Sequence, residues 1–476
     1  FSRQRSGKWR YCSVVVAAGG SPRAARSSAS MRAYSRRSLR SARMMLRRTQ
    51  KNRPDTTMVG RIAHNAATQK LSTPPGYAAL SPQVAPTATY PRSDALPAAR
   101  RGMTRMLDPM TPIIHATSPA EFLTVVPRLL GFVPQRSVVL VPFRRGRSRG
   151  AMRLDLPPDD DRADEIAATM IGLVCRVPEA DGCAIVVYGD TDAPARTLVE
   201  GIERRAEACG VLIVEALWVA GRRWGSYARS DSGSVPTADD LPPGIEDVAA
   251  PEANQYAGAD LLPLDASRST AVEAACEALD AAIRALVLAD ADHPTTDPAR
   301  IDPRAFAAAC LLDDLPAFVE RLLGSDAAAL DPFEIAAAAW ALGRPSLRDI
   351  ALICWVDGID AGDEAAQAQA CWEDGAEYPS EIAMRLWGEG PRPSPERLGR
   401  ALLLARHIAS AVPASRRPGP LAVAAWFSWA LGRSTHADLF AQQATAIEPE
   451  HGLAEIVRSF VGAGHLPDWA FRLDEP

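Results

Sequence analysis

The feature that most constrains the fold is an alternation of amphipathic helices and short apolar runs over residues 159–219. Residues 159–176 place apolar side chains at helical spacing and lead to the continuous apolar run 183–188. Residues 193–209 repeat the helical pattern and lead to 211–219, a run rich in β-branched residues. A strand that is apolar on both faces needs cover on both faces, which helices connecting parallel strands supply. The alternation therefore predicts an α/β sheet domain with at least partly parallel strand order.

The elements before this alternation fit the same α/β domain, for which we expect the bounds 113–228. Ser118 is suited to cap a helix whose first turn holds Pro119 and which ends at Gly131. Pro127 lies inside this helix and is expected to kink or split it. Two short apolar runs then predict a hairpin, at residues 137–143 and 151–156.

The rest of the body is predicted to be a loop followed by helices. Residues 229–266 are polar, acidic and studded with proline, without apolar periodicity, and predict a mobile loop and linker. After them, Gly or Pro punctuates a series of helical patterns. These patterns predict an all-α domain over residues 267–471, with helices at 269–288, 304–323, 332–342, 347–356, 395–411, 420–431, 435–447 and 452–461.

Near the C-terminus, the spacing of small residues is typical of a tetratricopeptide-like helical hairpin. Gly432, Ala437 and Ala444 fall at its small-residue positions, and Pro449 falls at its proline position. Small residues there let two helices approach closely. Because only one degenerate copy is visible, a single hairpin packed on a bundle is the alternative.

The helix over residues 421–431 is apolar around nearly its whole circumference. Such a helix must be buried on several sides. We therefore expect the indoles of Trp426 and Trp429 to be enclosed in a core, and not displayed on a binding face.

Charge divides the chain into a basic leader and an acidic body. Residues 1–102 contain 20 Lys and Arg side chains against only Asp55 and Asp94, whereas the remainder has 33 basic and 55 acidic side chains. The body's net charge of −22 repels phosphate backbones and offers no basic face to anionic lipid. We expect no nucleic-acid or membrane partner for the body.

The leader lacks sustained apolar periodicity, so we expect it to be disordered. Three interpretations fit it. It is a basic arm that binds nucleic acid if genuinely expressed, an organelle transit segment, or upstream sequence that was translated. We favour the last, because the chain opens with Phe1 while Met103, Met106 and Met110 lie directly before the first patterned segment.

Several classes of protein are disfavoured by what the sequence lacks. No apolar run reaches the length of about 18 residues that spans a bilayer, so we expect a cytoplasmic protein. The seven cysteines of the body are never spaced as C-x-x-C and lie mostly in apolar stretches, which predicts buried, reduced thiols. The histidines are scattered, and we expect neither a metal site nor a cofactor.

Several segments match a known family. Residues 116–132 read ATSPAEFLTVVPRLLGF, residues 136–141 read RSVVLV, and residues 153–157 read RLDLP. Further matches are LWVAGRRWGSY at 217–227, YAG at 256–258, LRD at 347–349 and GPLAVAAWFSWALG at 419–432. Together they resemble the actinobacterial domain of unknown function 4192, over about residues 113–471.

This resemblance implies no assigned activity. It stops short of the leader, and similar proteins start near Met110, which favours the translated-upstream interpretation. Relatives often carry several cysteines after the RW-x-SY segment, whereas residues 228–233 here read ARSDSG. If those cysteines bind metal in relatives, this chain does not.

Candidate ligand-binding residues lie where strands of the sheet end, because loops there carry polar groups over a rigid scaffold. Asp190 follows the apolar run 183–188, with an Asx turn that caps the next helix as its structural alternative. Asp155 shares one strand face with Arg153, and a surface ion pair between them is the alternative.

Two further groups complete the candidates. Arg223, Trp224 and Tyr227 form a basic and aromatic loop able to clamp an anionic ligand, although it is also a plain strand-end loop. Arg348 and Asp349 lie near a helix start, where the helix dipole alone favours an aspartate.

Two hypotheses of function remain. The first is a non-enzymatic binding or regulatory protein that recognises a protein or a small ligand. The alternative is an enzyme of unknown reaction with a cleft near Asp155, Asp190 and the Trp224 loop. The sequence contains no G-x-G-x-x-G, no P-loop, no G-x-S-x-G and no DNA-binding motif to decide between them.

Overall fold

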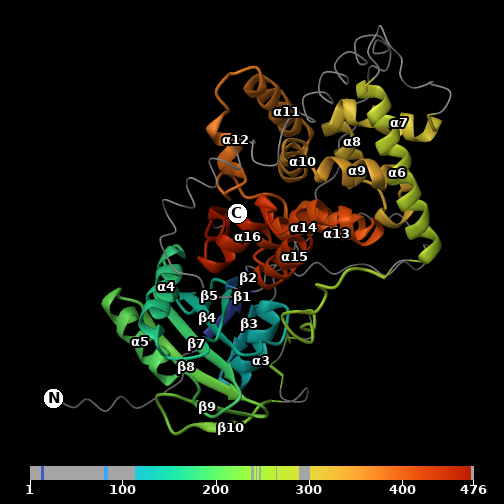
Figure 1. Cartoon of the computed structure of the whole chain (residues 1–476). Coiled ribbons are helices and arrows are strands. Elements are labelled where there is room, and N and C mark those ends of the chain that lie inside the picture. The colour runs from blue at the N-terminus through green and yellow to red at the C-terminus, as the bar shows by residue number, and fades with distance from the viewer. Residues whose placement is uncertain are drawn as a thin grey trace, which may run out of the picture. The chain divides into compact units, whose positions relative to one another are not determined.

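The computed structural model describes the patterned part of the chain and two short strands of the leader. The described residues are 12–15, 80–83, 113–236, 241–242, 244–245, 248–263, 265–288 and 301–472. They form two compact units that divide in the sequence between Ala257 and Gly258. The first unit is an α/β domain and the second is helical (Figure 1), which confirms the predicted fold class.

The first unit is built on one mixed, 10-stranded sheet. Its strands follow the order β10-β9-β8-β7-β4-β5-β1-β3, while β6 pairs with β4 and β2. Their bounds are β1 (Cys12–Val15), β2 (Leu80–Gln83), β3 (Ile113–Ala116), β4 (Ser137–Arg144), β5 (Arg147–Ser148), β6 (Ala151–Asp155), β7 (Gly182–Gly189), β8 (Leu212–Ala220), β9 (Arg223–Ser226) and β10 (Ser232–Ser234).

The central pairings combine both strand directions. β7 and β8 are parallel, as expected for strands joined by a crossover helix. β4 is antiparallel to β6 and to β7, so the predicted hairpin is present and lies beside the parallel pair. The prediction of partly parallel order is therefore confirmed.

Two strands of the leader also pair with this sheet. β1 pairs antiparallel with β3, and β2 pairs antiparallel with β6. The rest of the leader lies outside the described residues. Its interpretation as a disordered or translated upstream segment stays a prediction.

Helices cover both faces of the sheet, as the apolar runs require. The helix α3 (Pro119–Leu130) shares a hydrophobic core with Val139, Val141 and Val186. The alternate residues of these strands face the other way, where α4 (Ala163–Arg176) packs on β4 and α5 (Arg196–Ala208) packs on β8. Figure 1 shows α3 on one side of the sheet and α4 and α5 on the other.

The first helix begins and ends where its sequence predicts. The Ser118 hydroxyl accepts from the Glu121 amide at 3.2 Å, and Gly131 closes the helix with a φ of 81°. Of the expected kink or split at Pro127, the split is wrong, because α3 runs unbroken through the proline. The kink stays a prediction. Only the last turn follows the proline, and the burial of Leu129 and Leu130 holds that turn on the core.

The interval expected to be a linker contributes to the first unit. Ile245 and Val248 are buried in the core that α3 covers. The 252–257 segment runs beside the end of α3, where Val133 donates to the carbonyl of Glu252 at 3.0 Å and Glu252 donates to that of Gly131 at 2.8 Å. A few apolar side chains and backbone hydrogen bonds fix this segment without any local periodicity.

The regular secondary structure of the second unit is all helical within its described residues. Its α-helices are α6 (Ala266–Leu288), α7 (Pro303–Leu311), α8 (Leu315–Leu323), α9 (Pro332–Leu342), α10 (Pro345–Asp357), α11 (Ile359–Glu373), α12 (Ser380–Arg385), α13 (Pro395–Ala411), α14 (Pro418–Ala430), α15 (Ser434–Ile447) and α16 (Gly452–Gly462), with short 3-10 turns η4 (Leu312–Asp314), η5 (Ala327–Ala329), η6 (Ala414–Arg416) and η7 (Asp468–Ala470).

Three helical segments differ from the sequence prediction, and one of them is the short helix α12, which was not expected. The single helix expected over 304–323 is divided at η4, because Asp314 caps a new helix by accepting from Ala317 at 3.2 Å, and Pro316 takes the first turn. The helix α11 was not expected, since its sequence is acidic with little apolar periodicity. It packs on α10 through a glycine: a Cβ on Gly362 would lie 2.7 Å from that of Cys354.

The C-terminal helices enclose both indoles that the sequence placed in the core. Trp426 and Trp429 on α14 have no exposed surface. Their N–H groups donate to the carbonyls of Leu386 and His465, at 2.9 and 2.8 Å. The helices α14 and α15 pack together around Gly432, which turns the chain with a φ of 76°. Whether this pair is tetratricopeptide-like stays a prediction.

We predict that Trp426→Ala lowers the free energy of unfolding by about 3–5 kcal/mol, because it empties a fully packed site and strands the Leu386 carbonyl. Urea denaturation of the full chain measures this change. Trp372→Ala, at a half-buried indole on α11, is the matched control and should cost clearly less. An unchanged midpoint for Trp426→Ala would show that this helix is not a core element.

Candidate functional site

The register of the sheet brings the ends of several strands to one edge. Asp155, the last residue of β6, pairs with Ser137 at the start of β4. Ser137 also pairs with Tyr188 near the end of β7, and Tyr188 pairs with Val219 near the end of β8. The carboxyl ends of β6, β7 and β8 therefore share an edge, which we call the strand-end site. Residues from the ends of three strands therefore lie together where the sequence analysis expected a candidate site.

The buried guanidinium of Arg153 is the central group of the strand-end site. Its Nε donates to the Ser137 hydroxyl at 2.7 Å, and that hydroxyl donates to the Gln135 carbonyl at 2.7 Å. Its Nη2 forms an ion pair with Asp155, two residues along the same strand face. The predicted pairing of Arg153 with Asp155 is therefore present, but at a buried position and not at the sheet surface.

Burial sets the electrostatics of this pair. Arg153 has no exposed surface, which is rare for an arginine, while the Asp155 side chain is 28% exposed. Burial lowers the pKa of the Arg153 guanidinium, and the Asp155 carboxylate opposes this shift, with a smaller contribution from Tyr256. A charge without water needs partners of opposite sign. Asp155 supplies one and also reaches solvent.

The 252–257 segment closes one side of the site. Gln255 is 3% exposed and makes a reciprocal pair with the backbone of Gln135: its Oε1 accepts from the amide at 3.0 Å and its Nε2 donates to the carbonyl at 3.1 Å. The same Gln135 carbonyl accepts from Ser137. The segment is therefore tied to Arg153 through one shared carbonyl.

Tyr188 adds a polar atom without a partner. Its side chain is 7% exposed, and its hydroxyl makes no hydrogen bond among the described residues. Burial raises the pKa of this phenol, so it stays protonated and able to donate. Tyr188 and Ser137 are directly paired across β7 and β4. The backbone of Tyr188 is therefore at the same edge as the Arg153 pair, and its side chain packs in the core that α3 covers.

Two exposed ion pairs border the strand-end site. Asp190 pairs with Arg136 at 2.5 Å, and these side chains are 72% and 62% exposed. Arg223 pairs with Asp192 at 3.0 Å and lies with its guanidinium 6.0 Å from the centroid of the Trp218 ring. Exposed pairs of this kind contribute at most about 1 kcal/mol to stability, so they are available for exchange with a ligand.

The aromatic residues of the expected loop point elsewhere. Trp224 is 8% exposed and packs in the core under α3, which also contains Tyr188. Tyr227 donates its hydroxyl to the Pro194 carbonyl, and Arg196 lies 5.5 Å from its ring centroid. The clamp expected from Trp224 and Tyr227 is not assembled, because alternate residues of β9 face the core.

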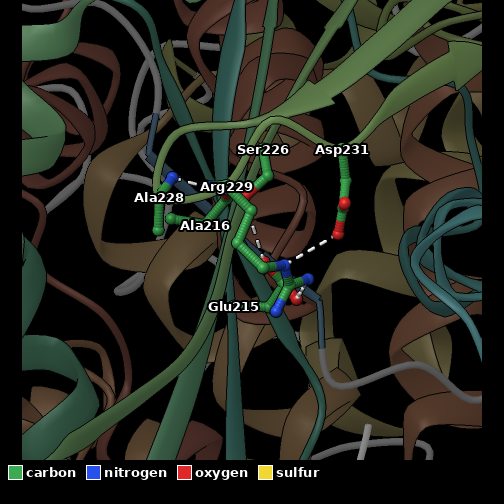
Figure 2. A network of polar contacts seen from close by, with 6 residues as sticks. All are labelled: Glu215, Ala216, Ser226, Ala228, Arg229 and Asp231. Atoms are coloured by element: carbon green, nitrogen blue, oxygen red, sulfur yellow. Dashed lines mark hydrogen bonds and ion pairs between the residues drawn. The ribbon is translucent and has the colours of Figure 1, made fainter. Parts of the chain in front are cut away.

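A second polar network fixes the hairpin that follows β8 (Figure 2). The Glu215 carboxylate, with its side chain 6% exposed, pairs with Arg229, whose Nε donates to Asp231 at 2.8 Å. The Ser226 hydroxyl accepts from the amides of Ala228 and Arg229, at 3.3 and 3.2 Å. These bonds hold residues 228–233, where relatives often carry cysteines, in a closed turn.

Arg348 and Asp349 belong to the helical unit, whereas the strand-end site belongs to the α/β unit. They form a buried pair on α10, with 2.9 Å between Nη2 and Oδ1. Burial raises the pKa of Asp349, which Arg348 opposes, and raises that of Tyr378 nearby. Burial and the Arg348 cation together lower the pKa of His451 to about 3. This cluster is a buried part of the helical packing.

Comparison with known families identifies the chain at this point. The model of a domain of unknown function, DUF4192, matches residues 119–383, more than half of the chain. The chain belongs to the DUF4192 family. The resemblance drawn from its motifs is thereby confirmed. The match includes the strand-end site and the Arg348 pair. No curated protein and no solved structure matches the chain.

Other features of this DUF4192 protein bear on its possible ligands. Within the described ranges, no group of three or more His, Cys, Asp or Glu side chains is arranged to hold a metal ion. None of the helices in the described part of the chain has the length and apolarity needed to cross a bilayer.

The cysteines differ from their prediction. Cys183, Cys276 and Cys354 are buried, but Cys175, Cys209 and Cys371 are exposed. The expectation that the body's thiols are uniformly buried is therefore wrong. Cys175 is in the last turn of α4 and Cys209 caps α5, and helix ends leave the sheet face for solvent.

Several residues of the strand-end site were missed from sequence. Ser137 and Tyr188 sit within or beside apolar runs and carry no motif of their own. Gln255 lies in a stretch without periodicity. The one sequence feature that pointed to this site was Arg153, a charged residue between apolar neighbours on a strand. Such a residue indicates either a solvent-exposed strand face or a buried ion pair.

We predict that Asp155→Asn lowers the free energy of unfolding by about 3 kcal/mol, because it removes a charge partner of a fully buried guanidinium. Asp190→Asn is the matched control at an exposed pair, and should cost less than about 1 kcal/mol. Denaturant unfolding of both variants measures the contrast. Equal losses would contradict the burial of Arg153.

We predict that His451 makes this protein less stable in acid. Its folded pKa of about 3 lies below the ordinary value of 6.5, so the unfolded chain binds the proton first and stability falls as pH decreases through 6.5. Between pH 7.5 and pH 5 the loss is about 2 kcal/mol. His451→Asn keeps a capping acceptor for Ala454 and should remove this loss, whereas His115→Asn, at an exposed site, should retain it. A parallel decline of both variants would rule the assignment out.

Proposed function

We propose that this DUF4192 protein is a non-enzymatic binding or regulatory protein whose α/β unit recognises a small polar ligand at the strand-end site. The observation that carries the proposal is the Tyr188 hydroxyl, which is buried and lacks a partner among the described residues. An unsatisfied buried hydroxyl costs about 1–3 kcal/mol. A fold tolerates that cost where a ligand supplies the missing hydrogen bond.

The groups around Tyr188 define the chemistry of the ligand. Arg153 and Ser137 are held rigidly and leave the partly exposed Asp155 carboxylate facing outward. Asp190 and Arg136 add one exposed charge of each sign. A small molecule with hydroxyl or amino donors for the carboxylates, and an acceptor for the phenol, fits this set. Its partners would be polar metabolites of the cytoplasm.

The charge of the body supports the remaining expectations about partners. Its excess of acidic side chains disfavours nucleic acid and anionic membranes. A protein partner at the same edge is the other form of the binding hypothesis. Nucleic-acid binding by the basic leader applies only if that leader is genuinely expressed.

The alternative is an enzyme of unknown reaction with a cleft at the strand ends. It requires a carboxylate poised as acid or base beside a bound substrate. Asp155 and Asp190 are each engaged by an arginine, and Trp224 is part of the core. These engagements favour recognition over catalysis.

We predict that Tyr188→Phe abolishes retention of the ligand without destabilising the fold, because the hydroxyl makes no hydrogen bond with any residue that the structure describes. The full chain is purified from its native cytosol, or incubated with that cytosol's metabolite extract, and analysed by native mass spectrometry alongside urea denaturation. Wild type should carry a small-molecule mass increment that Tyr188→Phe lacks.

Tyr227→Phe is the matched control. It removes a hydroxyl that donates to Pro194, so it should cost about 1 kcal/mol of stability and keep the ligand. Equal retention by wild type and Tyr188→Phe would contradict the proposal, as would a wild-type chain that retains no small molecule. Capture of a protein at the same edge would contradict the small-ligand proposal and support recognition of a protein partner instead.

A further inference from the structure

Two exposed thiols lie in contact on the outer helices of the α/β unit. Cys175 is in the last turn of α4, and Cys209 is the residue that caps α5. The two helices pack side by side on the sheet. The Cys175 and Cys209 thiols are close enough to interact, and both residues are exposed. The two cysteines are 34 positions apart in the sequence, so no local sequence motif predicts the pair.

The other cysteines of the body lack this combination of exposure and thiol contact. Cys183, Cys276 and Cys354 are buried, and burial raises the pKa of their thiols to about 12, 11 and 12. Buried, protonated thiols are inert. Cys310 on α7 is partly buried and Cys371 on α11 is exposed, and neither is in contact with a second thiol among the described residues.

We propose that Cys175 and Cys209 form a reversible disulfide, and that this pair is a redox modification site. A small-molecule disulfide such as glutathione disulfide is the oxidant. The thiolate of one cysteine attacks a sulfur of the oxidant, its S–S bond breaks, and one glutathione thiolate leaves. The second cysteine, already in contact, attacks the mixed disulfide and releases the other glutathione.

The exchange balances in atoms and electrons. Two electrons pass from the cysteine pair to the oxidant, and the two protons of the cysteine thiols end on the two released glutathiones. The new bond joins the C-terminal ends of α4 and α5, and closes a loop that contains β7. In a reducing compartment such a bond is transient, which is typical of a sensor and not of a structural disulfide.

The local chemistry sets the pH dependence of the reaction. Burial and the neighbouring Cys209 thiol raise the pKa of Cys175. Because the thiolate is the nucleophile, oxidation should be slow at neutral pH and accelerate as the pH rises through and beyond the ordinary thiol range.

The test uses the full chain with Cys12→Ser, Cys310→Ser and Cys371→Ser, so that these three thiols take up no glutathione. The reduced protein is incubated with excess glutathione disulfide at mildly alkaline pH, and followed by intact mass and peptide mapping. We expect the loss of two hydrogens, no retained glutathione, a Cys175–Cys209 crosslinked peptide, and full reversal by dithiothreitol. The oxidised protein should also unfold at a higher denaturant concentration.

Single variants distinguish a pair from two independent thiols. Adding Cys175→Ser or Cys209→Ser should leave one glutathione bound to the remaining cysteine, because no second thiol displaces it. Adding Cys183→Ser instead should leave the crosslink intact. Stable addition of glutathione to both Cys175 and Cys209 in the parent protein would overturn the proposal, as would a crosslink between other cysteines. Neither outcome depends on a ligand at the strand-end site.

Discussion

The burial of one guanidinium organises the α/β unit. Arg153 lies on a strand of the sheet with no exposed surface, and its charge requires polar partners where the surrounding residues are apolar. Ser137 and Asp155 are partners of the guanidinium, and the Ser137 hydroxyl in turn donates to the Gln135 carbonyl. Gln255, more than 100 residues later in the sequence, bonds to the Gln135 backbone. One charge thus couples β4, β6 and the 252–257 segment, and leaves a carboxylate at the strand-end site.

The helical unit solves its packing in a different way. Its core uses large aromatic side chains whose polar atoms are satisfied by backbone carbonyls, as in Trp426 and Trp429. Close approach depends on small residues such as Gly362. The Arg348 and Asp349 pair is enclosed in the same packing, with a neutral His451 beside it. Their burial accounts for them without a ligand.

The strand-end site was only partly visible in the sequence. Asp190 was chosen because it follows an apolar run, and Asp155 was chosen because it shares a strand face with Arg153. Strand direction places both at one edge. Trp224 and Tyr227 were chosen for their chemistry, and the alternation of β9 sends Trp224 into the core. Tyr188 and Gln255 were missed, since each acquires its role from a residue far along the chain. The contact between Cys175 and Cys209 arises in the same way from two packed helices.

The sequence by itself determined the kind and order of most elements, the acidic body, the buried helix around Trp426 and the family. These follow from local periodicity, because a helix or strand that buries one face repeats its apolar residues at 3.6 or 2 positions. The break at η4, the acidic helix α11 and the short helix α12 were not predicted from the sequence. Tertiary structure alone decided that β4 runs antiparallel beside β7, that Arg153 is buried, and which polar atoms meet. Strand register and lateral packing join residues distant in sequence, and local periodicity carries no information about such neighbours.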